Sequence, residues 1–158
     1  MSSSRWVVST PVGAGVSHQG EPDKPIGDAL SGIWWLGAHG GAGTTTLRTA
    51  AGTGQDCGQD WPAAPAGAVL LVARTHFAGL RAARQRLREH GPAAFRGLVL
   101  VPDAPGRLPR VLRQQVQVLS GAAPRLWEVP WVEAWRTDTS VSPDRQITRL
   151  LSRITETP

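Results

Sequence analysis

The stretch that decides the fold is residues 33–47, which reads IWWLGAHGGAGTTTL. Its apolar opening predicts a short buried strand, its glycine-rich middle predicts a tight turn, and its threonines predict the start of a helix. Small residues in such a turn allow several backbone N–H groups to converge on an anion at the N-terminus of the helix. The order of strand, glycine turn and helix is therefore typical of a phosphate-binding loop.

The turn departs from the common phosphate-loop pattern G-x-x-x-x-G-K-[ST] at two positions. Gly43 and Thr45 match the second glycine and the hydroxyl that faces the metal. Thr44, however, stands where the pattern has lysine, and Ala38 stands where it has the first glycine. The only lysine in the chain is Lys24, far from the loop in sequence. The loop has therefore kept its backbone cradle and lost its cation.

Beyond this stretch, apolar runs alternate with amphipathic ones, separated by connections that contain glycine and proline. The expected strands are residues 33–36, 68–73, 97–101 and 126–129, and the expected helices are residues 44–51, 77–90, 108–119 and 144–154. This alternation predicts an α/β three-layer domain over residues 31–156, with a mostly parallel sheet of four or five strands. Trp34 and Trp35 are adjacent, so on a strand they point to opposite faces, and we expect both in the core.

The first 30 residues show no sustained periodicity, and we expect a flexible segment there. Its apolar patch, Trp6 to Val8, either docks on the domain or binds a partner. No signal-peptide pattern and no apolar run of membrane-spanning length is visible, so no membrane association is expected. Cys57 is the single cysteine, which excludes an internal disulfide and fits a reducing compartment. We therefore expect a cytoplasmic protein.

The 158-residue chain carries a net charge of +5, almost entirely from arginine. A basic balance is compatible with nucleic-acid binding. The arginines are nevertheless spread over several expected helices, and no run of five basic residues occurs. Nucleic acid is therefore an alternative partner rather than the favoured one, and it would bind the face formed by Arg81, Arg84 and Arg88.

Several polar residues follow expected strands. In a parallel sheet the carboxyl ends of the strands meet at one edge, and ligands bind there. Arg74 at such an end either supplies the charge that the loop lacks or contacts carbonyl oxygens. Asp103 either receives a metal-bound water or a ribose hydroxyl, or it forms its turn through an Asx hydrogen bond. Trp131 and Trp135 share a face if their stretch is helical. We favour packing of the two rings between the sheet edge and the N-terminal segment over contact with a ligand.

Residues around the loop also have two interpretations each. His39 either contacts phosphate when protonated or orients a neighbour, or else it is a solvated turn residue, and we favour the last. Thr44, Thr45 and Thr46 either cap the helix or donate to phosphate, and we expect at least one of them to cap. Asp56 and Asp60 lie in a polar connection, and we expect their side chains to face solvent rather than to bind a metal ion.

Residues 39–46, HGGAGTTT, resemble the deviant Walker A loop K-G-G-x-G-K-T-T of the ParA/MinD-type ATPases. The order of strands and helices over residues 30–155 is also similar to that family. The chain looks closest to small actinobacterial proteins of unknown function that carry the stretches G-A-H-G-G-A-G, D-A-P-G-R-L-P and P-W-V-E-A-W-R. Here these stretches are residues 37–43, 103–109 and 130–136.

The resemblance implies a reduced P-loop NTPase-like domain that binds ATP or another nucleotide together with Mg²⁺. The implied contact residues are His39, Gly40, Gly41, Ala42, Gly43, Thr44, Thr45, Thr46, Asp103 and Trp131. Glycine amides and threonine hydroxyls would hold phosphate, Thr45 would also face Mg²⁺, and Trp131 would stack on the base. The implied partners are a nucleotide or phosphate ligand and either a second copy of the chain or another protein.

The departures from the family concern catalysis. His39 replaces the signature lysine that reaches across a dimer, Thr44 replaces the lysine on the β- and γ-phosphates, and residues 69–74 lack the Walker B aspartate. Phosphoryl transfer depends on positioning and charge stabilisation, so these losses predict a much lower rate. We expect a nucleotide- or phosphate-binding module with impaired or absent ATP hydrolysis, in a regulatory or assembly role. A pseudo-NTPase scaffold that binds no nucleotide is the alternative.

Overall fold

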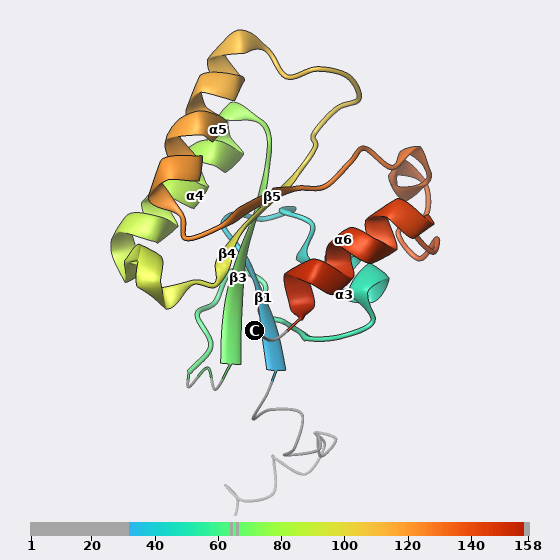
Figure 1. Cartoon of the computed structure of the whole chain (residues 1–158), viewed down its shortest axis with the longest axis horizontal. Helices are drawn as coiled ribbons and strands as arrows, with labels where there is room; N and C mark the ends of the chain where they lie inside the picture. Colours follow the sequence, from blue (N-terminus) through green and yellow to red (C-terminus); the bar gives the residue numbers. More distant parts are fainter. Residues whose placement is uncertain (1–31, 64, 66, 157–158) are drawn as a thin grey trace, which may run out of the picture.

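A computed structural model describes residues 32–63, 65 and 67–156, and its centre is an all-parallel sheet of five strands (Figure 1). The strands are β1 (Gly32–Gly37), β2 (Gln55–Asp56), β3 (Gly67–Arg74), β4 (Gly97–Val101) and β5 (Leu126–Glu128). Their order across the sheet is β2-β1-β3-β4-β5, and every pairing is parallel. The expected α/β fold is confirmed, with five strands. The N-terminal segment of residues 1–30, with Trp6, lies outside the described residues.

Helices cover both faces of this sheet, which gives the expected three layers. In Figure 1, α3 (Thr44–Ala51) and the red α6 (Arg145–Thr155) lie on one side of the sheet. On the other side lie α4 (Phe77–His90) and the orange α5 (Arg110–Ala122). Two short 3₁₀ helices, η3 (Pro92–Ala94) and η4 (Glu133–Arg136), occur in the connections. Within the described part of the chain, no helix has the length and apolar character needed to cross a membrane.

Each face of the sheet has its own apolar core. Towards α4 and α5, strand residues such as Leu71 pack with Leu80. Towards α3 and α6, Trp35 packs with Leu151. The adjacent Trp34 and Trp35 belong to opposite cores, as expected, but only Trp35 is fully buried while Trp34 is half-buried. Both faces of the sheet are therefore covered by packed helices, and a ligand can approach it at the ends of its strands.

Two elements differ from the sequence-based expectation. β2 falls in a stretch that we expected to be a polar connection, because two residues are too few to show a hydrophobic pattern. It exists because its backbone pairs with the neighbouring β1. α5 spans residues 110–122 rather than 108–119. Pro109 occupies its N-cap and disfavours helical backbone at the residue before it, and Gly121 lies inside the helix instead of ending it.

Candidate functional site

Two adjoining hollows lie at the carboxyl edge of the sheet, where the loops after β1, β3, β4 and β5 meet. A hollow of about 390 Å³ follows the glycine loop, residues 39–46, and Asp56 lies on its wall. A cleft of about 450 Å³ continues from it towards Asp103, Trp131 and Trp135. The two share residues of the loop and Arg74. The sequence-based choice of this edge is consistent with where the hollows lie.

Glycines set the backbone conformation of the loop and of the start of α3. Gly41 has a φ of 75° and Gly43 a φ of 106°, values that a residue with a side chain adopts only with strain. Gly43 is the N-cap of α3 and makes no side-chain cap, so the expectation that a threonine caps this helix was wrong. The threonines cannot cap because glycine stands at the N-cap and they follow it as the first residues of the helix, where the Leu47 N–H donates to the Gly43 carbonyl at 3.0 Å.

The first amides of α3 are consequently available. Within the described part of the chain, the N–H groups of Thr44, Thr45 and Thr46 donate to no protein acceptor. A helix N-terminus with free N–H groups carries a partial positive charge, which favours an anion. The loop can therefore attract phosphate through its backbone alone.

Asp56, which sequence reasoning left outside the candidate site, lies against the glycine loop. The Thr45 hydroxyl donates to Asp56 Oδ2 at 2.5 Å, and the Gly58 N–H donates to Asp56 Oδ1 at 2.9 Å. Partial burial acts to raise the pKa of Asp56, but the hydrogen bonds from Thr45, Gly58 and Thr44, with the charge of Arg48, outweigh it and lower the pKa. The side chain is exposed, as expected, yet it is anchored to the loop. The pairing of β2 with β1 places Asp56 beside the loop, and no local sequence pattern predicts that pairing.

His39 connects the glycine loop to the end of β3. Its Nε2 accepts from the Arg74 N–H at 3.0 Å, which leaves Nδ1 to donate to the Gly40 carbonyl at 2.8 Å. Its ring lies 5.1 Å from that of His76, the N-cap of α4. His39 is half-buried with both nitrogens engaged. The expectation of a solvated turn residue was therefore wrong, because the ring reaches back to the neighbouring strand.

Arg74 contacts carbonyl oxygens, the second of its two expected roles. Its Nε donates to the Gly41 carbonyl at 3.2 Å, and its Nη1 donates to the Pro102 carbonyl at 3.0 Å. The side chain thus ties the glycine loop to the end of β4. Because the same residue lines both hollows, its positive charge is also part of the site.

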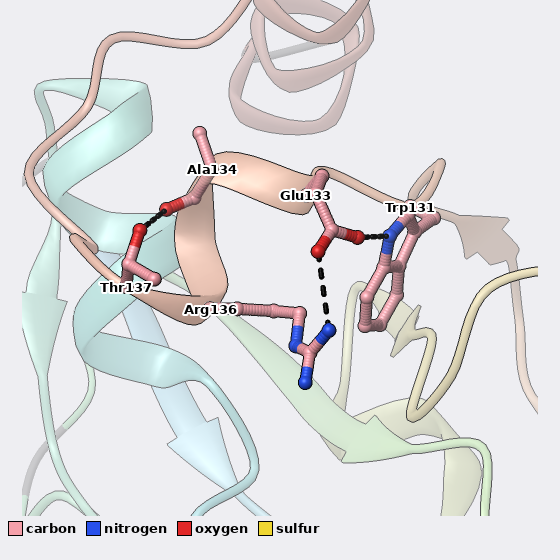
Figure 2. A network of polar contacts seen from close by, with 5 residues as sticks. All are labelled: Trp131, Glu133, Ala134, Arg136 and Thr137. Atoms are coloured by element: carbon pink, nitrogen blue, oxygen red, sulfur yellow. Dashed lines mark hydrogen bonds and ion pairs between the residues drawn. The ribbon is translucent and has the colours of Figure 1, made fainter.

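The far wall of the cleft is aromatic, and Figure 2 shows how it is fixed. Trp131 Nε1 donates to Glu133 Oε2 at 2.7 Å, and Arg136 Nη1 contacts Glu133 Oε1 at 3.1 Å. The hydrogen bond from Trp131, and then that from Arg136, lowers the pKa of Glu133. Trp135 also lines the cleft, although Trp131 precedes η4 rather than sharing a helix with it. The indole of Trp131 is therefore held at the cleft by a polar contact at its ring nitrogen.

Asp103 completes the cleft opposite the loop. Its side chain is exposed and lines the cleft, and its N–H donates to Thr75 Oγ1 at 3.1 Å. The structure thus gathers every implied contact residue around the two hollows. Asp103 and Trp131 lie in the cleft, and the implied loop residues lie along the hollow. Among the described residues, no cluster of three or more histidine, cysteine or acidic side chains could hold a metal ion.

Comparison with known proteins gives one match. The model of a family of unknown function (DUF6668) matches residues 31–154. No curated protein and no solved structure matches the chain. The matched range covers the strands and helices described above, including the glycine loop and the aromatic wall of the cleft.

Proposed function

This chain belongs to DUF6668, a family of unknown function, and we propose from its own site that it is a ParA/MinD-like module that binds a nucleotide or phosphate. The phosphates lie on the glycine loop, and the base lies in the cleft against Trp131. ATP hydrolysis is slow or absent. The module acts by regulating or assembling a partner rather than by turnover.

The observation that carries this proposal is that the N–H groups of Thr44, Thr45 and Thr46 donate to no acceptor among the described residues and lie beside an aromatic cleft, which Thr46 lines. Backbone donors at a helix N-terminus suit phosphate oxygens. An indole offers a flat apolar surface on which a base can stack. The cleft of about 450 Å³ and the loop hollow of about 390 Å³ are together large enough for such a ligand.

The electrostatics of the loop favour a ligand that arrives with Mg²⁺. The Asp56 carboxylate lies beside Thr45, and its negative charge repels a bare phosphate. Mg²⁺ is commonly held by one or two carboxylates together with phosphate oxygens and waters. Asp56 and the Thr45 hydroxyl supply hard oxygen ligands of this kind but too few for a site of their own. They fit a Mg²⁺ ion that the nucleotide brings with it.

The same residues argue against rapid hydrolysis. Thr44 supplies no charge at the lysine position, and the nitrogens of His39 are engaged with backbone groups. Arg74 donates to two carbonyl oxygens, so its charge is already partly used to hold the loop. Without a mobile cation on the transferred group, the transition state lacks its main stabilisation.

Isothermal titration calorimetry of the full chain with ATP and with inorganic phosphate, each with and without Mg²⁺, tests the proposal. We expect ATP·Mg²⁺ to bind with a Kd in the micromolar to millimolar range.

Two glycines provide a matched pair of variants that locate the binding site. Gly41 in the loop and Gly52 at the end of α3 have φ values of 75° and 69°, and a Cβ would meet nothing within 4 Å at either. Both Gly→Ala variants should lose a similar amount of stability, about 1–2 kcal/mol, because alanine is strained at a left-handed φ, but only Gly41→Ala should weaken binding.

A scaffold that binds no nucleotide is the second candidate, and one observation favours it. The two arginines that line the cleft are engaged, Arg74 with carbonyl oxygens and Arg136 with Glu133. Absence of heat with every ligand at several millimolar would support the scaffold and reject the binding module. Equal weakening of binding by Gly41→Ala and Gly52→Ala would show that the ligand binds elsewhere.

A further inference from the structure

An exposed apolar groove lies between α4 and α5. It has a volume of about 650 Å³. Three of the four large hydrophobic side chains exposed among the described residues line it: Phe77 at 58%, Val111 at 61% and Val118 at 54% exposure. The buried Leu80 and Leu119 lie at its base. Exposed apolar side chains gathered in one groove indicate an interaction surface.

One rim of the groove is strongly basic. Arg81, Arg84 and Arg88 follow Phe77 on α4 at spacings of four, three and four residues, which places them in one stripe along the helix. None of the three makes a hydrogen bond or ion pair with any described residue, and no acidic side chain lines the groove. The nearest α4 acid, Glu89, is engaged with Gln85 at 2.8 Å. Within the described residues, this rim therefore carries three cations without a charge partner, beside an apolar floor.

The opposite rim is neutral. On α5, Val111 and Val118 are seven residues apart and therefore lie on one face, with Gln114 and Gln115 between them. The groove thus has a basic edge, an apolar floor and an amide-bearing edge. From Phe77 to Arg88 it follows α4 for about 17 Å, the length of a helix of about three turns.

We propose that this α4–α5 groove binds an acidic amphipathic helix of a partner protein. Apolar side chains of that helix pack on Phe77, Val111 and Val118, and its carboxylates, spaced at i, i+3 or i+4, and i+7, pair with the three arginines. Binding of an amphipathic helix along a groove is a common recognition mode. The surface is separate from the glycine loop, so the proposal holds whether or not a nucleotide binds.

Two other occupants fit the groove less well. A second copy docked groove to groove would bring three more arginines and no carboxylate to the interface, so the cations would gain like charges and no partner. Nucleic acid would pair its phosphates with the arginines, but it offers no close apolar partner for Val111 and Val118. A helix with one acidic and one apolar edge satisfies both features together.

Photo-crosslinking in cells of the natural host identifies the occupant. The full chain would carry p-benzoylphenylalanine in place of Val118 in the groove, or in place of the control residue Val141, which is exposed elsewhere. Mass spectrometry of the crosslinked peptide should find an amphipathic helical segment of another protein, with acidic residues along one edge. Crosslinking to residues 1–31 of the same chain, to a second copy, to nucleic acid or to a non-acidic segment would overturn the proposal, as would a yield no higher than that from position 141.

Charge reversal tests the basic edge with a matched control. Arg81→Glu with Arg84→Glu should reduce the crosslink yield, and the affinity for a synthetic peptide of the captured segment, by about tenfold or more. Because these arginines have no partners among the described residues, the melting temperature should stay nearly unchanged. The control, Arg149→Glu with Arg153→Glu on α6, changes the net charge equally at exposed positions outside the groove. An equal loss of crosslink yield and peptide affinity in both double variants would show that only net charge matters, and it would overturn the proposed docking site.

Discussion

At the scale of single residues, the glycine loop is held by side-chain hydrogen bonds that connect it to other strands. His39 and Arg74 join it to β3 and β4, while Asp56 reaches it from β2. Each contact involves a polar group whose partner lies far away in the sequence. The loop is therefore prepared by the sheet around it rather than by its own composition, and a change in any of these residues should alter the loop without unfolding the domain.

Asp56→Asn tests this anchoring through its pH dependence. Because the folded state lowers the pKa of Asp56, the carboxylate stabilises the fold above its unfolded pKa near 4, and this stabilisation is lost as the pH falls through the lower folded value. Since the group is exposed, we expect the variant to lose only about 1 kcal/mol of unfolding free energy at pH 7. Urea denaturation should show the difference shrinking below pH 4.

Asp60→Asn is the control for this variant, because the Asp60 side chain makes no hydrogen bond with the described residues. It should match the wild type throughout the pH range. A loss in Asp56→Asn that is the same at low and neutral pH would mean that the carboxylate charge does not contribute.

At the scale of elements, α4 starts in unusually close contact with the end of β3. A Cβ added at Gly79 would lie 2.4 Å from the Arg74 carbonyl oxygen and 2.9 Å from His39 Nε2. The glycine is thus needed for the approach of the helix to the strand end and to the loop histidine. The His76 side chain caps the same helix by accepting from the Gly79 N–H at 2.9 Å.

Gly79→Ala and Gly121→Ala should therefore shift stability in opposite directions. Helix propensity alone favours alanine over glycine by up to about 1 kcal/mol. At Gly121 of α5 a Cβ meets nothing within 4 Å, so this variant should melt at a higher temperature. At Gly79 the clash with backbone should outweigh propensity and cost about 1–3 kcal/mol. Thermal denaturation followed by circular dichroism measures both, and a higher melting temperature for Gly79→Ala would contradict the close contact.

At the scale of the whole molecule, two cores share one sheet. Leu80 of α4 belongs to the core on one face, and Ile154 of α6 to the core on the other. Both side chains are almost completely buried. The strands between them are buried on both faces, so loss of either core exposes the same sheet, and the domain should unfold as one unit.

Leu80→Ala and Ile154→Val test this unity. The first should cost about 3 kcal/mol and the second about 1 kcal/mol. Because the two sites lie on opposite faces and share no neighbour in either core, the double variant should lose the sum to within about 0.5 kcal/mol. Urea denaturation followed in parallel by tryptophan fluorescence and circular dichroism should give one coincident transition. Separate transitions for the two probes would show that the faces unfold independently.

The sequence by itself determined the α/β class, the three layers and the edge that carries the glycine loop. These features follow from interactions between near neighbours: apolar runs form buried strands, amphipathic spacing forms covering helices, and parallel strands bring their ends together. The adjacent Trp34 and Trp35 could likewise be assigned to opposite faces from the pleat of a strand alone.

Only the tertiary structure decided the contacts that give the candidate site its character. β2 is too short for any pattern, yet its pairing with β1 places Asp56 beside Thr45. The contact of His39 with Arg74 spans 35 positions and depends on the register of β1 against β3. The α4–α5 groove is likewise produced by two helices packing side by side. Each of these depends on residues distant in sequence, whose meeting is fixed by strand order and helix packing rather than by local preference.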